Sequence, residues 1–279
     1  MKCGIMRIDS LDALSLLNDK KLYVLDLDGT VYIENKLIDG ALDFVRAVKQ
    51  AGSEVLFLTN NSSMSTSDYV NKIKAFGFPV TDHMILTSGF AAGAYIKEHY
   101  PADCSVYIAG TEALRNEFRT MGFTICEESS QQADCVLVGF DTELTYAKLR
   151  ACCKYIERGA EFIATNPDIV CPVANNRFIP DCGSICKMIQ NATGAEPQFI
   201  GKPGRIMADI ISKRFTVPHD KMVMIGDRLY TDIAFGINAN MTSICVLTGE
   251  TTPEMLHESP WKPDIVVSSI KFLNSLWKE

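Results

Sequence analysis

Two aspartates stand two residues apart in the pentapeptide Asp26-Leu27-Asp28-Gly29-Thr30. They follow the apolar run Leu22–Leu25, which predicts a buried strand ending near the first carboxylate. Residues two apart in a strand face the same way, so both carboxylates can address one reactant if the extended backbone persists. Ligands of open α/β sheets bind at the carboxyl ends of the strands. The pentapeptide therefore indicates paired carboxylate chemistry, and its structural alternative is a polar strand end with a helix-capping aspartate.

Three later segments place polar side chains after other apolar runs. They are Thr59-Asn60-Asn61-Ser62-Ser63 after Val55–Leu58, Gly201-Lys202-Pro203 after Phe199–Ile200, and Gly226-Asp227-Arg228-Leu229-Tyr230-Thr231-Asp232 after Met222–Ile225. Singly, each has a structural explanation: a turn or N-cap at Thr59 and Asn60, a solvated Lys202, or a helix cap at Asp232. Together they predict one active site, because folding alone does not require a lysine and four aspartates at one sheet edge.

The elements that would position these groups alternate between strand and helix. The first block runs Leu22–Leu25, a helix near Ala41–Ala51, Val55–Leu58, a helix near Ser65–Phe76, and Ile85–Leu86; the second runs Phe199–Ile200, a helix over Arg205–Phe215, Met222–Ile225, a helix from Asp232, and Ile244–Leu247. This order implies a parallel sheet with right-handed crossovers. We expect an α/β fold, a doubly wound parallel sheet with a Rossmann-like core, built from residues 1–88 and 197–279.

The segment between the two blocks, residues 89–196, is predicted to be an inserted α/β cap domain because it is long enough for its own core. Its expected strands lie near Val106–Ile108, Val136–Val138, Phe162–Ala164 and Phe178–Ile179. Asn166-Pro167-Asp168 follows the third of these, where Pro167 stiffens a turn. Asn166 and Asp168 are candidate substrate residues, and an ordinary Asx-type turn is the alternative.

Composition limits the partners. The net charge of −7 disfavours nucleic acid and anionic membranes, which reward clustered Lys and Arg. No apolar stretch long enough for a membrane span and no cleavage-site pattern is present, so we expect a cytoplasmic protein. The ten cysteines are scattered through apolar segments, which favours free thiols over a disulfide framework or a zinc site. The four histidines show no metal or triad spacing.

The four polar segments, in this order, resemble the four motifs of the haloacid dehalogenase superfamily. The long insert between the second and third motifs is similar to that of the NagD-like, 4-nitrophenyl phosphatase-like branch, and the likeness runs from about Lys20 to about Leu276. It implies a magnesium-dependent phosphomonoesterase that forms an aspartyl phosphate. The Ala164–Asp168 segment also matches the insert of that branch, though less specifically.

The resemblance also implies the residue roles. Asp26 would be the nucleophile, Asp28 the general acid/base, Thr59 and Asn60 the phosphoryl binders, and Lys202 their cationic partner. Mg²⁺ would take the Asp26 carboxylate, the Asp28 main-chain carbonyl and the Asp227 carboxylate, with Asp232 behind them. A carboxylate approaching a phosphate is repelled by about 4 kcal/mol per charge pair at 4 Å and a dielectric near 20, so the attack needs cations. A hard cation suits these oxygen ligands better than zinc.

Other functions stay open. A phosphoacceptor signalling module also combines a phosphorylated Asp with a Thr and a Lys, but Asp28 and the insert oppose it. A catalytically idle binding protein could keep the fold, and phosphotransfer to an alcohol or sugar could replace hydrolysis. Dehalogenation is disfavoured, because it needs neither a metal nor a second Asp. The expected partner is a small-molecule phosphate monoester of unspecified identity, and the chain is compatible with a monomer or a homodimer.

Overall fold

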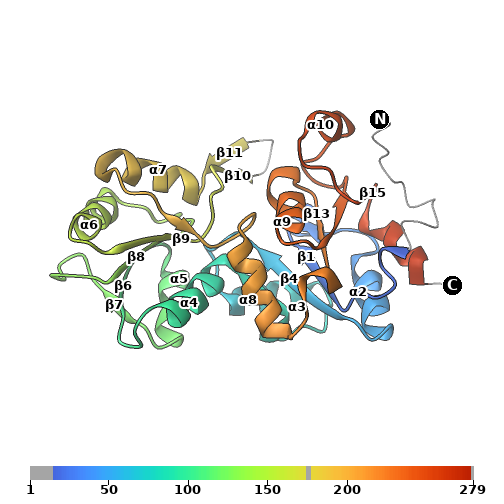
Figure 1. Cartoon of the computed structure of the whole chain (residues 1–279), viewed down its shortest axis with the longest axis horizontal. Coiled ribbons are helices and arrows are strands. Elements are labelled where there is room, and N and C mark those ends of the chain that lie inside the picture. The colour runs from blue at the N-terminus through green and yellow to red at the C-terminus, as the bar shows by residue number, and fades with distance from the viewer. Residues whose placement is uncertain (1–14, 174–176, 278–279) are drawn as a thin grey trace. The chain divides into compact units, whose positions relative to one another are not determined.

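The computed structural model describes residues 15–173 and 177–277. Contacts between residues divide the chain into two compact units. Unit 1 consists of the described parts of Met1–Thr59, Val70–Leu86 and Lys202–Glu279, and unit 2 of Asn60–Tyr69 and the described part of Thr87–Gly201. The expected α/β class is confirmed, because each unit is built on its own largely parallel sheet with helices beside it (Figure 1).

Unit 1 contains a sheet of six strands in the order β15-β14-β13-β1-β4-β5. The strands are β1 (Leu22–Asp26), β4 (Glu54–Thr59), β5 (Ile85–Thr87), β13 (Met222–Gly226), β14 (Thr242–Val246) and β15 (Ile265–Val267). β1 lies in the middle and pairs in parallel with β4 and β13. Residues 22–25 are almost completely buried, as expected for a strand covered on both faces.

The order of this sheet changes direction at β1. From β1 the chain moves through α2 (Ala41–Gln50) to β4 and through α3 (Thr66–Ala75) to β5, whereas β13, β14 and β15 extend the sheet on the other side of β1. Such a change of direction is the topological switch point at which doubly wound sheets bind ligands. Three of the four sequence motifs therefore follow β1, β4 and β13, the strands at this point.

The remaining elements of unit 1 surround the sheet (Figure 1). They are the hairpin β2 (Tyr32–Ile33) and β3 (Lys36–Leu37), the helices α8 (Arg205–Phe215), α9 (Ala234–Asn238) and α10 (Pro253–Glu258), and the short helices η1 (Asp82–Met84), η2 (His219–Lys221), η3 (Leu229–Ile233) and η4 (Ile270–Trp277). Helix α2 shows why such elements form, since its buried residues Ala41, Phe44, Val45 and Val48 recur at helical spacing.

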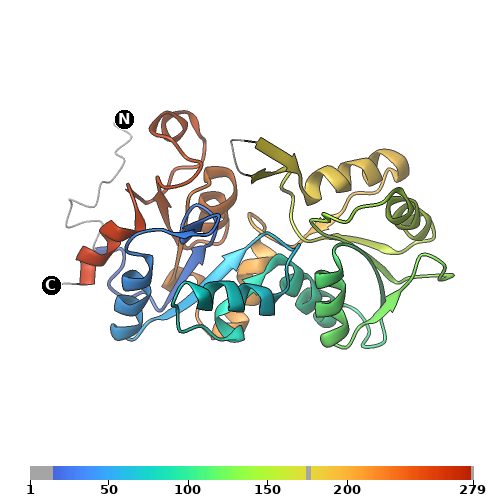
Figure 2. The same ribbon diagram turned by 180° about the vertical axis from the view of Figure 1, so that it is seen from behind.

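Unit 2 contains a second parallel sheet, in the order β12-β9-β8-β6-β7. Its strands are β6 (Ser105–Ala109), β7 (Thr124–Cys126), β8 (Cys135–Val138), β9 (Glu161–Ala164) and β12 (Gln198–Phe199). Both views show helices α4 (Ser88–His99) and α5 (Glu112–Thr120) on one face and α6 (Tyr146–Glu157) and α7 (Cys182–Thr193) on the other (Figures 1 and 2).

Two expected strands lie elsewhere than predicted. Phe199–Ile200 was expected in the sheet of the core, but β12 pairs with β9 of unit 2, where Phe199 lies opposite Ala164. The second, Phe178–Ile179, is not part of a large sheet, because β11 (Arg177–Pro180) forms an antiparallel hairpin with β10 (Val170–Val173). Short apolar runs identify a strand but not its partner. Within the described ranges, no helix has the length and apolar character needed to cross a membrane.

Candidate active site

Asp26 and Lys202 meet at the carboxyl end of the unit 1 sheet. Asp26 is the last residue of β1, and the Nζ atom of Lys202 donates to its Oδ1 atom at 2.6 Å. The same Nζ donates to Oδ1 of Asp232, also at 2.6 Å. The side chain of Lys202 is only 2% exposed, so these charge-assisted bonds are shielded from water and hold the ammonium group in a fixed position.

Asp227 lies beside Asp26 and Asp232. Its carboxylate fits there because the neighbouring residues Gly29 and Gly249 have no side chains. Asp227 follows β13, and a Cβ atom on Gly29 would lie 2.6 Å from its carboxylate, while one on Gly249 would overlap it. Gly29 also has φ of 91°, a backbone conformation that other residues rarely adopt. Asp227 Oδ2 accepts from the backbone N–H of Glu250 at 2.6 Å, but its buried Oδ1 has no hydrogen-bond partner.

Asp232 lies on a turn with unusual hydrogen bonding. Residues Leu229–Ile233 form one turn of π-helix, in which the N–H of Ile233 donates to the carbonyl of Arg228 at 3.1 Å. Such turns occur frequently at functional sites. Asp232 does not cap α9, as one structural alternative proposed; its Oδ2 accepts from the N–H of Arg228 at 3.1 Å while Oδ1 binds Lys202.

Thr59 is placed at the same edge by strand register. It ends β4, in which Leu58 lies opposite Asp26 of β1, and its side chain is buried. Asn60 follows directly in the chain but is counted with unit 2. There its amide Nδ2 donates to Asp168 Oδ2 at 2.9 Å, and its carbonyl accepts from the side chains of Ser88 and Asn166.

Asn166 and Asp168 are therefore buried residues that form hydrogen bonds with Asn60, and they do not lie on an open surface. Asn166 is completely buried, with its Nδ2 donating to the Asn60 carbonyl at 2.8 Å and its Oδ1 accepting from the N–H of Asp168 at 2.9 Å. The Asx turn that the sequence offered as an alternative is present. It serves to hold the backbone and side chain of Asn60 within unit 2.

The carboxylates of unit 1 perturb one another. Burial and the neighbouring Asp232 raise the pKa of Asp227 to about 7. Burial and Asp232 also raise the pKa of Asp26 well above its usual range, although Lys202 opposes the shift. Burial alone would lower the pKa of Lys202, but Asp232 and Asp26 raise it overall, so the amine stays charged. Arg228 also interacts with all three carboxylates, and the group still has more negative charge than Lys202 and Arg228 neutralise.

This excess matches a divalent cation. Carboxylate oxygens of Asp26, Asp227 and Asp232 lie within 4.8 Å of one another, and the positive charges of Lys202 and the nearby Arg228 leave one of the three negative charges in excess. The partnerless Oδ1 of Asp227 supplies a ligand atom already stripped of water. Both oxygens of Asp232 have protein partners. The donor set therefore fits Mg²⁺, with Asp26 and Asp227 as the better ligands and Asp232 as the residue that holds Lys202.

Asp28 has partners that the sequence did not suggest. It is exposed, and the hydroxyl group of Tyr32 donates to its Oδ2 at 3.3 Å. Protein atoms around the carboxylate displace water and raise its pKa, while Lys72 and Arg228 lower it. Arg228 itself has a side chain 17% exposed, with Nε 3.3 Å from Glu250 Oε2. No motif spacing pointed to Tyr32 or Lys72; Arg228 stood inside a motif but had no assigned role.

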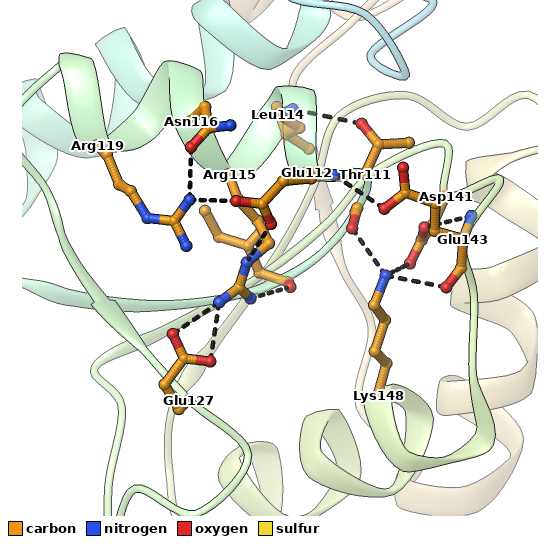
Figure 3. Close-up of polar contacts among 12 residues, drawn as sticks. Thr111, Glu112, Leu114, Arg115, Asn116, Arg119, Glu127, Asp141, Glu143 and Lys148 are labelled. Atoms are coloured by element: carbon orange, nitrogen blue, oxygen red, sulfur yellow. Dashed lines mark hydrogen bonds and ion pairs between the residues drawn. The ribbon is translucent and has the colours of Figure 1, made fainter.

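Unit 2 has a second polar cluster, near the carboxyl ends of β6 and β8 (Figure 3). Lys148 Nζ donates to Asp141 Oδ2 at 2.8 Å and to the carbonyls of Gly110 and Glu143. Arg115 makes a bidentate pair with Glu127 at 2.9 and 3.0 Å. Arg115, Glu127, Glu143 and Lys148 are among the residues that line a cavity of about 510 Å³. Each cation in it is already bound by protein groups, so the cluster is a closed network.

The remaining predicted features concern cysteine. The nine cysteines of the described ranges are free thiols, and Cys3 lies outside those ranges. In residues 15–173 and 177–277 the group able to hold a metal is that of Asp26, Asp227 and Asp232, with none formed by cysteine.

Comparison with known proteins places these features in a family. A family model described as haloacid dehalogenase-like hydrolase matches residues 23–124, and a second, for HAD-hydrolase-like proteins, matches residues 199–273. The 5'-nucleotidase YutF of Bacillus subtilis (strain 168) is 36% identical over 90% of this chain and 96% of its own.

Solved structures agree with this result. The crystal structure of 4-nitrophenylphosphatase from Thermotoga maritima is 39% identical, with a TM-score of 0.88 over 93% of this chain and 98% of that chain. NagD from Escherichia coli K-12 is 28% identical, with a TM-score of 0.82 over 90% and 97% of the two chains.

The chain therefore belongs to the haloacid dehalogenase-like hydrolases. The resemblance to the NagD-like, 4-nitrophenyl phosphatase-like branch is confirmed, and so is the predicted enzyme class, a phosphatase.

Proposed function

We propose that this protein is a magnesium-dependent phosphomonoesterase that transfers the phosphoryl group of a small substrate to Asp26 and then to water. The observation that carries the proposal is the arrangement at the end of β1. There Asp26 is bonded to the buried Lys202, next to the partnerless Asp227 oxygen. Such a group binds and neutralises a transferring phosphoryl group, for which positioning and charge stabilisation supply most of the catalysis.

In this mechanism the residues of the chain share the work. Lys202 neutralises charge on the phosphoryl oxygens while it fixes the orientation of the Asp26 carboxylate. Thr59 and Asn60 donate hydrogen bonds to the same oxygens. When bound, Mg²⁺ would be held by Asp26, Asp227 and the Asp28 carbonyl and would reduce the repulsion between two anions. Asp232 keeps the ammonium of Lys202 in place.

Asp28 completes the cycle by moving protons. Its carboxyl group protonates the leaving oxygen as the bond to phosphorus breaks, and the resulting carboxylate takes a proton from the water that attacks the aspartyl phosphate. The raised pKa of Asp28 favours the protonated form that the first step requires. Without this residue the enzyme would stop after the first transfer, as a phosphoacceptor module does.

The substrate class is proposed from the relatives. One is named a 5'-nucleotidase and another a 4-nitrophenylphosphatase. The substrates in these names share a phosphoryl group but differ in the leaving group attached to it. We therefore propose small phosphate monoesters in general. The described residues of unit 1 that bind the phosphoryl group include nothing shaped for an organic leaving group, so we assign that selection to unit 2, with Asn166 and Asp168 acting through Asn60.

The decisive experiment traps the covalent intermediate. Enzyme mixed with ³²P-labelled 4-nitrophenyl phosphate and quenched in acid should carry a label that hydroxylamine removes, as an acyl phosphate does. The Asp28→Asn variant should accumulate this label and release it slowly, and Asp26→Asn should carry none. A label that persists in the parent protein would favour the signalling module. Neither label nor turnover across a panel of phosphate esters would favour an idle binding protein.

A further inference from the structure

We propose that Tyr32 is a positioning residue for the Asp28 carboxylate and that Lys72 holds Tyr32 in that role. The proposal rests on the proposed function, in which Asp28 transfers the proton, and adds residues that no motif contains. Tyr32 comes from hairpin strand β2 and Lys72 from helix α3.

The phenol of Tyr32 is fixed from several sides. Its side chain is completely buried, and its ring stacks on Phe76 with centroids 5.4 Å apart and planes at 26°. The Nζ atom of Lys72 lies 3.9 Å above the same ring. The backbone is fixed as well, since the Tyr32 carbonyl accepts from the N–H of Gly29 at 2.8 Å and its N–H donates to Leu27 at 3.2 Å. The hydroxyl group therefore has a defined position relative to Asp28.

Asp28 needs such a partner because of where it lies. It is an exposed residue just after the end of β1, between the buried Leu27 and Thr30, and the terminal torsion of an aspartate is intrinsically broad. The bond from Tyr32 occupies Oδ2, which leaves Oδ1 as the oxygen that carries the transferred proton. A carboxyl group whose plane is fixed loses less orientational freedom in the transition state than one that rotates.

Lys72 acts on Asp28 in two ways, by the direct attraction of its charge and through the ring of Tyr32. A cation over an aromatic face is attracted to it, and it draws electron density from the phenol, which makes the hydroxyl group a better donor. Replacing Lys72 should therefore weaken the bond to Asp28 without removing it.

The test measures how rate depends on the leaving group. The value of kcat/KM includes only steps up to the first phosphoryl transfer, and proton donation matters most when the leaving alkoxide is strongly basic. For Tyr32→Phe we expect kcat/KM to fall about tenfold on an alkyl phosphate and less than about twofold on 4-nitrophenyl phosphate, a modest part of the usual gain from general acid catalysis. Substituted phenyl phosphates should fall between these limits.

Matched variants separate positioning from structural damage. Lys72→Met should show a weaker form of the same leaving-group dependence, and Lys72→Arg, which keeps a cation over the ring, should restore the parent pattern. Lys74→Met on the same helix and Tyr23→Phe on β1 should leave the pattern unchanged. Circular dichroism and thermal unfolding confirm that each variant is folded; if Tyr32→Phe does not fold, the two Lys72 variants decide the question.

A double-mutant cycle gives the decisive outcome. Asp28→Asn alone should steepen the leaving-group dependence, and adding Tyr32→Phe to it should have no further effect on any ester. An equal loss on all esters for Tyr32→Phe, or a full additional loss in the Asp28→Asn background, would overturn the role of Tyr32 and leave the proposed function intact. An unchanged dependence in Asp28→Asn itself would instead overturn the acid role of Asp28.

Discussion

The two parallel sheets carry polar groups at their carboxyl ends, but the groups are balanced differently. In unit 1, Asp26 and Asp232 share the buried Lys202, and a buried oxygen of the neighbouring Asp227 has no partner. In unit 2, each donor of Lys148 has an acceptor, and Arg115 is paired with Glu127 (Figure 3). Folding thus satisfies the donors of Lys148 and Arg115 in the second cluster, whereas it leaves an oxygen of Asp227 without a partner in the first.

The chain itself fills part of the edge in unit 2. Ser62 accepts from the N–H of Phe140 at 2.9 Å and lies 3.0 Å from the hydroxyl group of Thr165, while Thr111 donates to the carbonyl of Ser63. These contacts place the segment Asn60–Thr66 against the ends of β6, β8 and β9. The carboxyl end of a doubly wound sheet is where ligands bind. The two units suggest that polar groups left without protein partners at that end distinguish a binding site from a structural network.

The largest effect should come from Asp26→Asn. Loss of the nucleophile should reduce kcat more than about a thousandfold. Stability should change little or rise, because the substitution removes one charge from a group with too many negative charges. Steady-state kinetics and thermal unfolding measure both, with the exposed Asp209→Asn as control. Activity within about tenfold of the parent would contradict the assignment.

Removing the metal tests whether the excess negative charge of Asp26, Asp227 and Asp232 binds a cation. Chelation should abolish activity, Mg²⁺ should restore it, and Ca²⁺ should restore it poorly, because Ca²⁺ prefers more ligands and longer bonds. Mg²⁺ should also raise the unfolding temperature of the parent, by mass action on the folded state, and do so less for Asp227→Ala. Full activity in chelator, or an identical Mg²⁺ response in that variant, would exclude this role for Asp227.

The closed network of unit 2 should respond in stability rather than in catalysis. Lys148→Met leaves the fully buried Asp141 side chain without its cation, which should cost about 3 kcal/mol of unfolding free energy. Turnover per folded molecule should remain near that of the parent. Adding Asp141→Asn should recover part of the loss in urea unfolding. A large fall in kcat/KM without loss of stability would show that this cluster belongs to the catalytic site.

The smallest expected effect is a change in the pH dependence of stability at Glu117. This residue differs from the paired groups of unit 2 because one of its buried carboxylate oxygens has no hydrogen-bond partner. It accepts from the N–H of Thr66 at 2.8 Å, but its buried Oε2 has no partner, and burial raises its pKa. The folded state thus holds a proton that the unfolded chain releases at lower pH. The parent should lose stability relative to Glu117→Gln as pH rises from the unfolded to the folded pKa.

Urea unfolding of both proteins between pH 4 and pH 8 measures this difference. Below the unfolded pKa the two proteins should differ by a constant amount, and the difference should again become constant above the folded pKa. A gap that does not change with pH would show that Glu117 ionises normally in the folded protein.

The sequence predicted the fold class, and it predicted that Asp26, Asp227 and Asp232 lie together because β1 and β13 end at one edge of the same parallel sheet. It also predicted Lys202 at this edge, but for a wrong reason, because the strand before Lys202 belongs to the sheet of unit 2. It did not predict that Phe199 pairs with β9, since strand runs do not specify their neighbours. The sequence also did not indicate that Tyr32 and Lys72 lie together, because one is in a hairpin and the other in a helix, with no characteristic sequence spacing between them. The burial of Asn166 was also missed, since a polar turn ordinarily indicates the surface.

The sheet of unit 1 cannot be completed early in translation. Its central strand β1 lies between β4 and β13, and β13 is translated long after β1 and β4. Nascent domains generally fold as they emerge from the ribosome, and unit 2 has all its residues once Gly201 has been added. The central strand of unit 1, however, lacks one neighbour until β13 is translated. Lys202, Asp227 and Asp232 are made in the same late stretch. A nascent chain therefore contains Asp26 long before the residues that surround its carboxylate in the folded protein have been made.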